Sequence, residues 1–355
     1  MKSRSVVASA LCLAGLAIVA RAIDPPKWAT PKAASAEQLA AEIDGYIKDL
    51  EKQGLNGIVL ITYKGKDLLH KAYGLADRES GRKMTVETGS CIGSIVKPIT
   101  KAAIIKLESE GKLRLDDVLP RFFDNVPPDK AEITLQQVLD HKAGFPDIFG
   151  DDYEPATKEW VIEKLMTTPL IAKPGEKESY SNAGYSLLGA VIEKLGQMPY
   201  EKYVHSQLFV PAGTPRIGYL IPGWKNEELA VGYKDGKRWG TPLDHPWMAD
   251  GPSWNLRCNG GMIATVRDLH SYFDAVLGGR VLSAEGTKSY RKQAIRKRSS
   301  GEQVIGSVGG NGITNSIYVN LVDDQFVFVM FTSVAEFESE EVFKQLKQRI
   351  LDFVL

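Results

Sequence analysis

The chain has 355 residues, of which 43% are hydrophobic and 25% charged, and its 44 Lys and Arg residues balance 44 Asp and Glu residues. This composition is typical of a globular protein and excludes a disordered or fibrous one. Because a chain without net charge has no electrostatic footprint for nucleic acid, we expect no nucleic-acid partner.

The first 22 residues predict a secretory signal peptide. Met1–Arg4 is basic, Val6–Ala20 is apolar, and Ala20-Arg21-Ala22 fits a small-x-small cleavage site. The apolar stretch is shorter than the roughly 20 residues that a membrane span needs. We therefore expect cleavage after Ala22 and a secreted or periplasmic protein without a transmembrane anchor.

The following residues predict a leader, a helix and a hairpin. Residues 23–35 are rich in Pro and Ala, which indicates a flexible leader before a domain over residues 36–355. Apolar residues recur at helical spacing over residues 36–54. Residues 57–63 and 67–73 have the pattern of two strands joined by a turn at Lys64-Gly65-Lys66.

The rest of the chain changes from helical to strand patterns. Helical patterns dominate from Lys97 to about Leu208, and a loop-rich segment follows over residues 211–261. A helix over 266–277, strands over 315–322 and 325–332, and a final amphipathic helix then complete the chain. We expect a mixed α/β (α+β) fold, in which a mainly helical lobe of residues 110–250 is inserted into a lobe built on a sheet, with a cleft between them.

Ser94 and Lys97 are the candidate nucleophile and base. Their spacing places a hydroxyl beside an amine on one helical face, and a buried amine that loses its proton can activate a serine. Only this pair opens an apolar helix that can desolvate the amine. The same spacing recurs in polar or charged segments at Ser80/Lys83, Ser109/Lys112 and Ser289/Lys292. In the alternative interpretation, Ser94 caps a helix and Lys97 lies on the surface.

Tyr180 and Asn182 form a second candidate pair. In an extended segment, residues two apart face the same side. A phenol near an ammonium can lose its proton more easily and relay it, and an asparagine can hold a lysine and a substrate amide or carbonyl. The alternative is a buried tyrosine with Asn182 as a helix N-cap.

Taken in order, these landmarks resemble the serine β-lactamase and penicillin-binding-protein superfamily. The likeness is to its class C β-lactamase-related branch, which includes family VIII-type carboxylesterases and D-amino-acid peptidases. It rests on Gly93-Ser94-Ile95-Val96-Lys97, Asp140-His141-Lys142-Ala143-Gly144 with Ala143 at a usual serine, Tyr180-Ser181-Asn182, and Gly260-Gly261-Met262 to Leu269. The resemblance covers nearly the whole mature chain and implies a β-lactamase/transpeptidase-like fold, with an antiparallel sheet flanked by the terminal helices.

The resemblance also implies roles for the candidate residues. Ser94 is then the acylated nucleophile, Lys97 its base and Tyr180 the proton relay, while Asn182 orients Lys97 and the substrate. One oxyanion donor is the Ser94 N–H, and the other comes from the strand that carries the third motif of the family.

The third motif departs from the family pattern, because no Lys or His stands at Val308-Gly309-Gly310 or Ser307-Val308-Gly309. We still expect Gly309, Gly310 and Asn311 to bind substrate, with an oxyanion donor near Gly310 or Asn311. Without the cation, a substrate carboxylate loses its partner, which argues against penicillins and peptides with a free D-alanine end. Arg257 is a candidate replacement cation.

Two further features of the sequence each allow two interpretations. Cleavage of the signal peptide leaves Cys91 and Cys258, which in an oxidising compartment form one disulfide or remain a pair of buried thiols. The basic segment Lys288–Arg298 predicts a solvated surface, with contact to an anionic envelope polymer as the alternative.

The sequence therefore predicts an exported serine hydrolase that acts on a small-molecule ester or acyl compound. A D-amino-acid peptidase and a weak β-lactamase are alternatives within the same chemistry. A non-catalytic protein that binds envelope peptidoglycan or other cell-wall fragments is the alternative from another class. No His-Glu-x-x-His, Cys-x-x-Cys or nucleotide-binding fingerprint occurs, so we expect neither a metal nor a cofactor.

Overall fold

The computed structural model describes residues 25–28, 31–245, 247–297, 301–323 and 325–354. The signal peptide and cleavage site expected at residues 1–22 lie outside the described residues. Within them, none of the helices combines the length and the apolar character that crossing a membrane requires.

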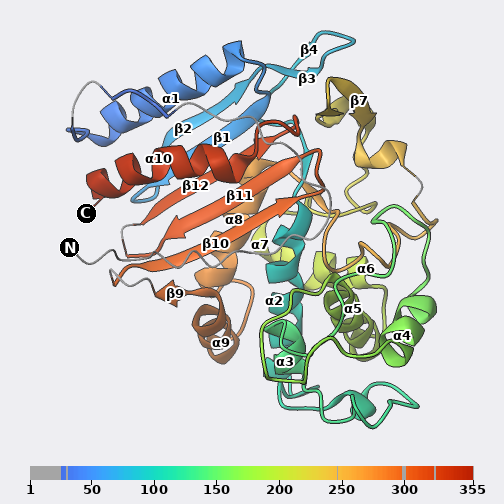
Figure 1. Cartoon of the computed structure of the whole chain (residues 1–355). Coiled ribbons are helices and arrows are strands. Elements are labelled where there is room, and N and C mark those ends of the chain that lie inside the picture. The colour runs from blue at the N-terminus through green and yellow to red at the C-terminus, as the bar shows by residue number, and fades with distance from the viewer. Residues whose placement is uncertain (1–24, 29–30, 246, 298–300, 324, 355) are drawn as a thin grey trace, which may run out of the picture.

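In the described chain, a six-stranded antiparallel sheet has the order β2-β1-β12-β11-β10-β9 (Figure 1). Its strands are β1 (Gly57–Tyr63), β2 (Lys66–Tyr73), β9 (Arg296–Lys297), β10 (Gln303–Gly310), β11 (Asn315–Leu321) and β12 (Phe326–Thr332). The early strand β1 pairs with the late strand β12, with Gly57 opposite Thr332. Strands from the two ends of the chain are thus neighbours in one sheet. The predicted hairpins are confirmed.

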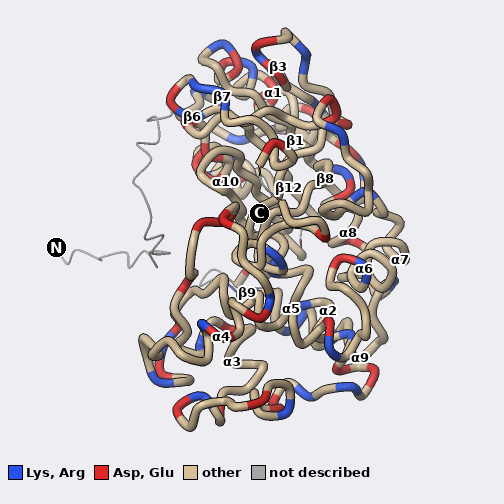
Figure 2. Tube along the Cα trace, turned by 90° about the vertical axis from the view of Figure 1, so that its right-hand side faces the viewer, with Lys and Arg blue, Asp and Glu red and all other residues tan. Residues whose placement is uncertain are grey.

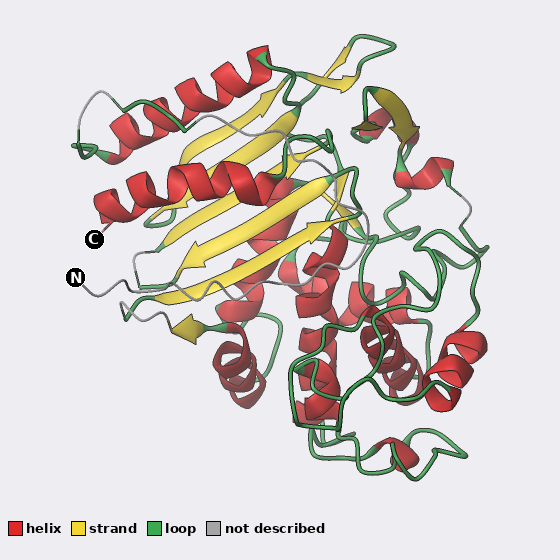
Figure 3. Cartoon of the chain, in the orientation of Figure 1, coloured by secondary structure: helices red, strands yellow, loops and turns green. Residues whose placement is uncertain are grey.

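Helices cover both faces of this sheet. α1 (Ala36–Lys52) and α10 (Ser339–Val354) lie on one face, and α8 (Val266–Leu277) lies on the other (Figures 1 and 3). Val59 and Ile61 of β1 pack into the core beneath α1 and α10, while Ile58 and Leu60 pack into the opposite core. Because both faces are buried, β1 is a continuous apolar run. The mixed α/β class with flanking terminal helices is confirmed.

The middle of the chain forms the helical part of the molecule. It comprises α2 (Val96–Ser109), α3 (Leu135–Leu139), α4 (Lys158–Thr167), α5 (Asn182–Gly196), α6 (Tyr200–Val204) and α7 (Val210–Ala212), and α9 (Ala284–Ala294) follows α8. In Figure 3 these helices gather beside one end of the sheet, joined by long loops. Three two-stranded sheets pair β3 (Leu75–Asp77) with β4 (Arg82–Lys83), β5 (Ser90–Cys91) with β8 (Ile263–Ala264), and β6 (Gly232–Lys234) with β7 (Lys237–Gly240).

Part of the expected leader packs onto the fold. The Trp28 ring lies 6.5 Å from the Tyr46 ring of α1, and the Arg349 guanidinium of α10 lies 5.3 Å from the Trp28 ring centre. Ala33 is buried. Trp28 and Ala33 of the expected leader thus contact the folded domain, because an aromatic side chain gains free energy when it packs on apolar surface.

A buried ion pair joins the two terminal helices. Arg349 Nε donates to Glu42 Oε2 and Arg349 Nη2 donates to Glu42 Oε1, each at 2.7 Å. The Arg349 side chain is 1% exposed and that of Glu42 15%. We expect Glu42→Ala to lower the free energy of unfolding by about 3–5 kcal/mol, because it leaves a buried guanidinium without its counter-charge.

Urea denaturation of Glu42→Ala and Asp49→Ala measures this effect. Asp49 belongs to the same helix, but it pairs with Lys52 on the surface, so its loss should change stability by less than about 1 kcal/mol. Equal effects of the two substitutions would show that the Glu42–Arg349 pair does not join the helices.

Candidate active site

A tight turn places Ser94 against strand β10 of the large sheet. Ser94 lies in a 3₁₀ turn, η1 (Gly93–Ile95), between β5 and α2. Gly93 has a φ of +49°, and a Cβ added there would lie 2.3 Å from the Gly310 nitrogen of β10. Only glycine therefore allows the turn to approach β10 so closely. The Ser94 side chain caps neither η1 nor α2, so the capping interpretation is wrong.

Lys97 is buried, and its Nζ lies 3.0 Å from Ser94 Oγ. It also donates to Asn182 Oδ1 at 2.6 Å and to the Asn259 carbonyl at 2.8 Å. Burial lowers the pKa of Lys97 to about 7. A neutral amine can satisfy the two fixed acceptors with its two N–H bonds, which leaves its lone pair for the Ser94 hydroxyl. This arrangement allows Lys97 to take the Ser94 proton.

The amide of Asn182 has its orientation fixed by Asp147. The backbone N–H and the Nδ2 of Asn182 both donate to Asp147 Oδ1, at 3.0 and 2.9 Å. Because Nδ2 is occupied in this way, Oδ1 faces Lys97. The N-cap of α5 is Ser181, whose hydroxyl accepts from the Gly184 N–H, so Asn182 is not the cap.

Tyr180 completes the group, with its hydroxyl 2.7 Å from Ser94 Oγ. Burial is the largest influence on this phenol and raises the pKa of Tyr180 above its ordinary value. The expectation that a nearby ammonium would ease the loss of its proton is therefore wrong in direction. As a neutral hydroxyl, Tyr180 can still donate one proton and accept another, which is what a relay requires.

His141 packs against the Tyr180 ring and binds the backbone of the following residue. Its Nδ1 accepts the Ser181 N–H at 3.1 Å, and its ring lies 4.6 Å from the Tyr180 ring. Burial lowers the pKa of His141 to about 3, so the imidazole is neutral and adds no charge to the site. His141 was part of the motif that carries the family resemblance. Asp147 and the Asn259 carbonyl had no comparable signal in the sequence.

The backbone of β10 supplies a donor beside Ser94. The Asn311 N–H is bonded to the Thr314 carbonyl at 3.3 Å. Since antiparallel pairs alternate, the next pair, Gly310 with Asn315, directs its N–H groups away from the β10–β11 ladder. η1 lies against this part of β10, because a Cβ added to Gly93 would lie 2.3 Å from the Gly310 nitrogen. The N–H groups of Gly310 and Ser94 are thus the two candidate oxyanion donors.

The Asn311 side chain stabilises the turn that follows β10. Its Oδ1 accepts from the N–H groups of Ile313 and Thr314 at 3.0 and 2.8 Å, and its Nδ2 donates to the Tyr153 hydroxyl at 3.4 Å. Of the two positions expected to provide the second oxyanion donor, Gly310 is the one whose N–H is not used by the turn.

Arg257 does not replace the missing cation. Its Nη1 and Nη2 each donate to a carboxylate oxygen of Asp250 at 2.9 Å, and its Nε donates to the Pro252 carbonyl at 3.1 Å. The Arg257 side chain is buried, while Asp250 reaches it from the exposed surface. The hypothesis of a replacement cation at Arg257 is therefore wrong, because a buried charge holds the counter-charge that compensates its desolvation.

Cys91 and Cys258 are free thiols, and both are buried. Cys91 lies in β5 opposite Ile263. Cys258 faces α5 instead, since a Cβ added to Gly189 would lie 2.0 Å from its Sγ. Of the two alternatives, the structure has two buried thiols, because the two side chains point into different parts of the core.

The remaining motifs stay apart from this site. None of the other three Ser-x-x-Lys pairs, all of which lie in the described chain, has a hydrogen bond between its serine and its lysine; they are Ser80/Lys83, Ser109/Lys112 and Ser289/Lys292. The described side chains also contain no group of three or more His, Cys, Asp or Glu placed to hold a metal ion. Along the described chain, basic and acidic residues are interspersed (Figure 2).

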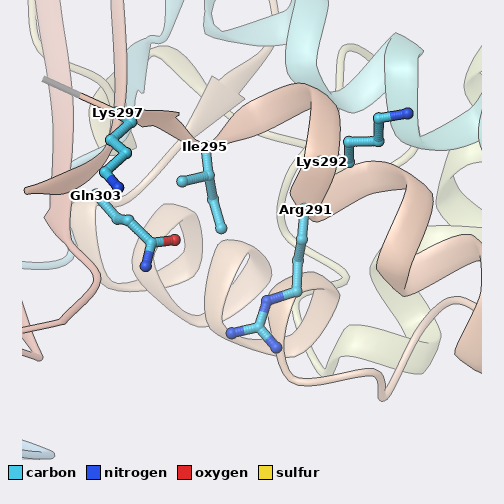
Figure 4. Close-up of a pocket in the computed structure, with 5 residues that line it drawn as sticks. All are labelled: Arg291, Lys292, Ile295, Lys297 and Gln303. Atoms are coloured by element: carbon cyan, nitrogen blue, oxygen red, sulfur yellow. The ribbon is translucent and has the colours of Figure 1, made fainter. Parts of the chain in front are cut away.

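The basic segment forms part of a separate hollow of ≈ 440 Å³ between α9 and the sheet edge (Figure 4). The hollow is lined by Arg291, Lys292, Ile295, Lys297 and Gln303. Its basic side chains are exposed, as expected of a solvated surface, and Arg298 lies outside the described residues. Gln303 and Gly310 stand at opposite ends of β10, about 23 Å apart at the rise of a strand. The hollow therefore does not belong to the Ser94 site.

An antiparallel sheet that meets an inserted helical lobe at a Ser–Lys–Tyr group defines the β-lactamase/transpeptidase-like superfamily. The family model described as Beta-lactamase matches residues 39–341, and the chain belongs to this family. Members of the superfamily are serine hydrolases.

One protein of related sequence and two solved structures illustrate what this chain is similar to. "Protein flp" of Staphylococcus aureus (strain NCTC 8325 / PS 47) is 29% identical over 299 residues, which are 81% of this chain and 57% of that protein. The chain thus spans little more than half of the length of this relative. The octameric penicillin-binding protein homologue from Pyrococcus abyssi has a TM-score of 0.74 at 24% identity, covering 88% of this chain and 77% of its own. EstCE1, a hydrolase with promiscuous acyltransferase activity, has a TM-score of 0.73 at 20% identity, covering 89% and 99%. At these identities, the similarity between structures establishes the fold.

The assignment of the two cysteines as free thiols predicts their reactivity. Burial raises the pKa of Cys91 to about 11 and also raises that of Cys258, so neither thiol should react in the folded protein. We expect a thiol reagent such as DTNB to find no accessible thiol under native conditions, and both Cys91 and Cys258 after denaturation without a reductant. If DTNB detected the thiols only after reduction, the disulfide interpretation would be correct instead.

Proposed function

We propose that this protein is an exported serine hydrolase that cleaves carboxylic esters or related acyl compounds through an acyl-enzyme on Ser94. The observation that carries the proposal is the buried Lys97 amine, 3.0 Å from Ser94 Oγ, with two fixed acceptors for its own protons. A binding protein has no need for this arrangement. Export rests on the N-terminal sequence pattern.

Acylation begins when the Ser94 proton passes to Lys97 and Oγ forms a bond to the substrate carbonyl carbon. The carbonyl π electrons move to the oxygen, and the N–H groups of Ser94 and Gly310 stabilise the resulting oxyanion. Donors placed in this way are worth about 3 kcal/mol each. As the intermediate collapses, the bond to the leaving alkoxide breaks. The alkoxide takes a proton from Tyr180, which regains one from the Lys97 ammonium.

Deacylation reverses these transfers with water. Water attacks the acyl carbonyl and gives a proton to Tyr180, while Tyr180 passes its own proton to the neutral Lys97. The second intermediate expels Ser94 Oγ, which takes the proton back from Lys97. The products are the carboxylic acid and the free enzyme.

The charges around the site support esters as the substrate class. β10 carries no cation beside Ser94, and Arg257 is bound to Asp250. A substrate carboxylate thus has no partner there, whereas an ester or an amide with a neutral leaving side needs none. The similar fold of EstCE1, described as a hydrolase with promiscuous acyltransferase activity, is consistent with acyl transfer by this class of site.

Removal of the nucleophile tests the proposal. We expect the mature protein to hydrolyse short-chain p-nitrophenyl esters and Ser94→Ala to lose about 10³-fold or more in kcat, because no acyl-enzyme can form. Ser80→Ala is the matched control, since Ser80 has the same spacing to a lysine but is exposed. Intact mass after incubation with a β-lactam should show no adduct, in keeping with the missing cation.

Two other outcomes would change the assignment. A stable β-lactam adduct on Ser94 would indicate a penicillin-binding protein or a weak β-lactamase. If neither turnover nor an adduct is found with any acyl donor, the protein is instead the envelope-binding alternative.

The pH dependence tests Lys97 as the base. Because the pKa of Lys97 is lowered to about 7, the amine is neutral above that pH and protonated below it. For a neutral ester, kcat/KM should rise about tenfold per pH unit below pH 7 and level off above it. The measurement is a pH–rate profile from pH 5 to 9, corrected for spontaneous hydrolysis. A profile that rises without a plateau up to pH 9 would contradict a neutral Lys97.

A further inference from the structure

The carbonyl that accepts from Lys97 belongs to a segment with an unusual backbone. Cys258, which directly precedes Asn259, has a φ of +73°. Residues other than glycine rarely adopt this left-handed conformation, and the surrounding structure has to maintain it. Cys258 and Asn259 are both buried, so the contacts that maintain it come from the protein interior. The left-handed residue thus stands directly before the carbonyl on which the proposed base depends.

Helix α2 holds this segment with two side chains. Lys97 and Thr100 lie three residues apart and therefore on one face of the helix. Lys97 Nζ donates to the Asn259 carbonyl at 2.8 Å, and Thr100 Oγ1 donates to the preceding carbonyl, that of Cys258, at 2.6 Å. The Tyr200 hydroxyl lies 2.7 Å from Thr100 Oγ1. Because the single Thr100 proton is used in the bond to the carbonyl, Tyr200 is the donor to Thr100.

Tyr219 holds the same segment through its hydroxyl. The hydroxyl accepts from the Cys258 N–H at 3.2 Å and donates to the Gly260 carbonyl at 2.9 Å. The Tyr219 side chain is fully buried. Since one hydroxyl ties the residue before Asn259 to the residue after it, the peptide that carries the Asn259 carbonyl has little freedom to rotate.

Further contacts fix the segment beside the nucleophile. Asn259 Nδ2 donates to the Asn255 carbonyl at 2.8 Å and to Ser186 Oγ at 3.1 Å. Gly260 lies against the turn η1, because a Cβ added to Gly260 would lie 3.7 Å from the carbonyl group of Gly93. A fully satisfied polar network of this kind makes a buried region rigid.

The network adds no charge to the site. Thr100 does not ionise, and burial raises the pKa of Tyr219 well above its ordinary value, so its phenol is neutral. Substitution of either residue therefore leaves in place the titratable groups beside Lys97, which are Asp147, Asp152, His141 and Tyr180.

We propose that Thr100 and Tyr219 are positioning residues for the transfer of the Ser94 proton. Together they fix the Asn259 carbonyl, which holds one N–H of the Lys97 amine. The second fixed acceptor holds the other N–H, so only one orientation remains for the lone pair, toward Ser94 Oγ. A carbonyl that could move would let the amine rotate and would slow the transfer. This inference rests on the proposed acyl-enzyme function and specifies how its base is held.

The experiment compares Tyr219→Phe, Thr100→Val and Thr100→Ser with the wild type. The values of kcat and KM for p-nitrophenyl acetate are measured from pH 5 to 9. The active fraction of each protein is counted by intact mass after labelling with a fluorophosphonate. Thr100→Val keeps the shape of the side chain and loses the hydroxyl, whereas Thr100→Ser keeps the hydroxyl and loses the methyl group.

Tyr73→Phe is the control for the loss of a buried tyrosine hydroxyl. The Tyr73 hydroxyl donates to Asp44 Oδ1 at 2.8 Å, and the residue packs into the separate core beneath α1 and α10. Its loss can lower stability without reaching the Ser94 site.

We expect Tyr219→Phe and Thr100→Val to lower kcat about tenfold with KM unchanged. We also expect the midpoint of kcat/KM to move to lower pH by about 0.5–1 unit, because a fixed acceptor stabilises an ammonium more than an amine. Thr100→Ser and Tyr73→Phe should keep the wild-type midpoint. The midpoint does not depend on how much of the protein is folded.

A midpoint that stays in place or rises in Tyr219→Phe or in Thr100→Val overturns the role of that residue, even if kcat falls, because its contacts then serve only stability. If one of the two variants does not fold, the other decides. A Thr100→Ser variant that is less active than Thr100→Val also overturns the inference, since packing and not the hydroxyl then matters. Turnover by the wild type in these cases leaves the proposed function intact, whereas its absence overturns both.

Discussion

The removal of the Lys97 amine from water is the constraint on which the rest of the site depends. At its ordinary pKa, a lysine is an ammonium at neutral pH and cannot accept a proton from serine. Burial brings its pKa to about 7. Asn182 and the Asn259 carbonyl then compensate the amine for its lost hydration. Each of these elements is needed, because an amine buried without acceptors would destabilise the fold instead of serving it.

The topology brings these groups together from distant parts of the chain. The pairing of β1 with β12 completes the sheet from both ends of the sequence, and the helical lobe lies between them. η1 and α2 carry Ser94 and Lys97 to the point where α5 begins and β10 ends. The close approach of η1 to β10 is possible only because Gly93 and Gly309 have no side chains. The left-handed conformation of Gly93, which glycine adopts without strain, thus sets the position of Ser94.

Two of the carboxylates near the site are bound to partners within the protein. Asp250 neutralises Arg257, and Asp147 is committed to Asn182, so both serve the structure. No Lys or Arg stands on β10, and the proposal of a substrate without a carboxylate rests on this feature.

The sequence by itself determined most of the elements and the candidate reacting group. Local periodicity gave the bounds of α8 and of β1 without error, and the order of motifs brought out Ser94, Lys97, Tyr180 and Asn182. Only the tertiary structure decided the direction of the Tyr180 pKa, the separation of Cys91 from Cys258, the partner of Arg257 and the packing of Trp28. The physical reason is that burial and partners come from residues far apart in the chain. The Asn259 carbonyl lies 162 positions from Lys97, and no local pattern records that contact.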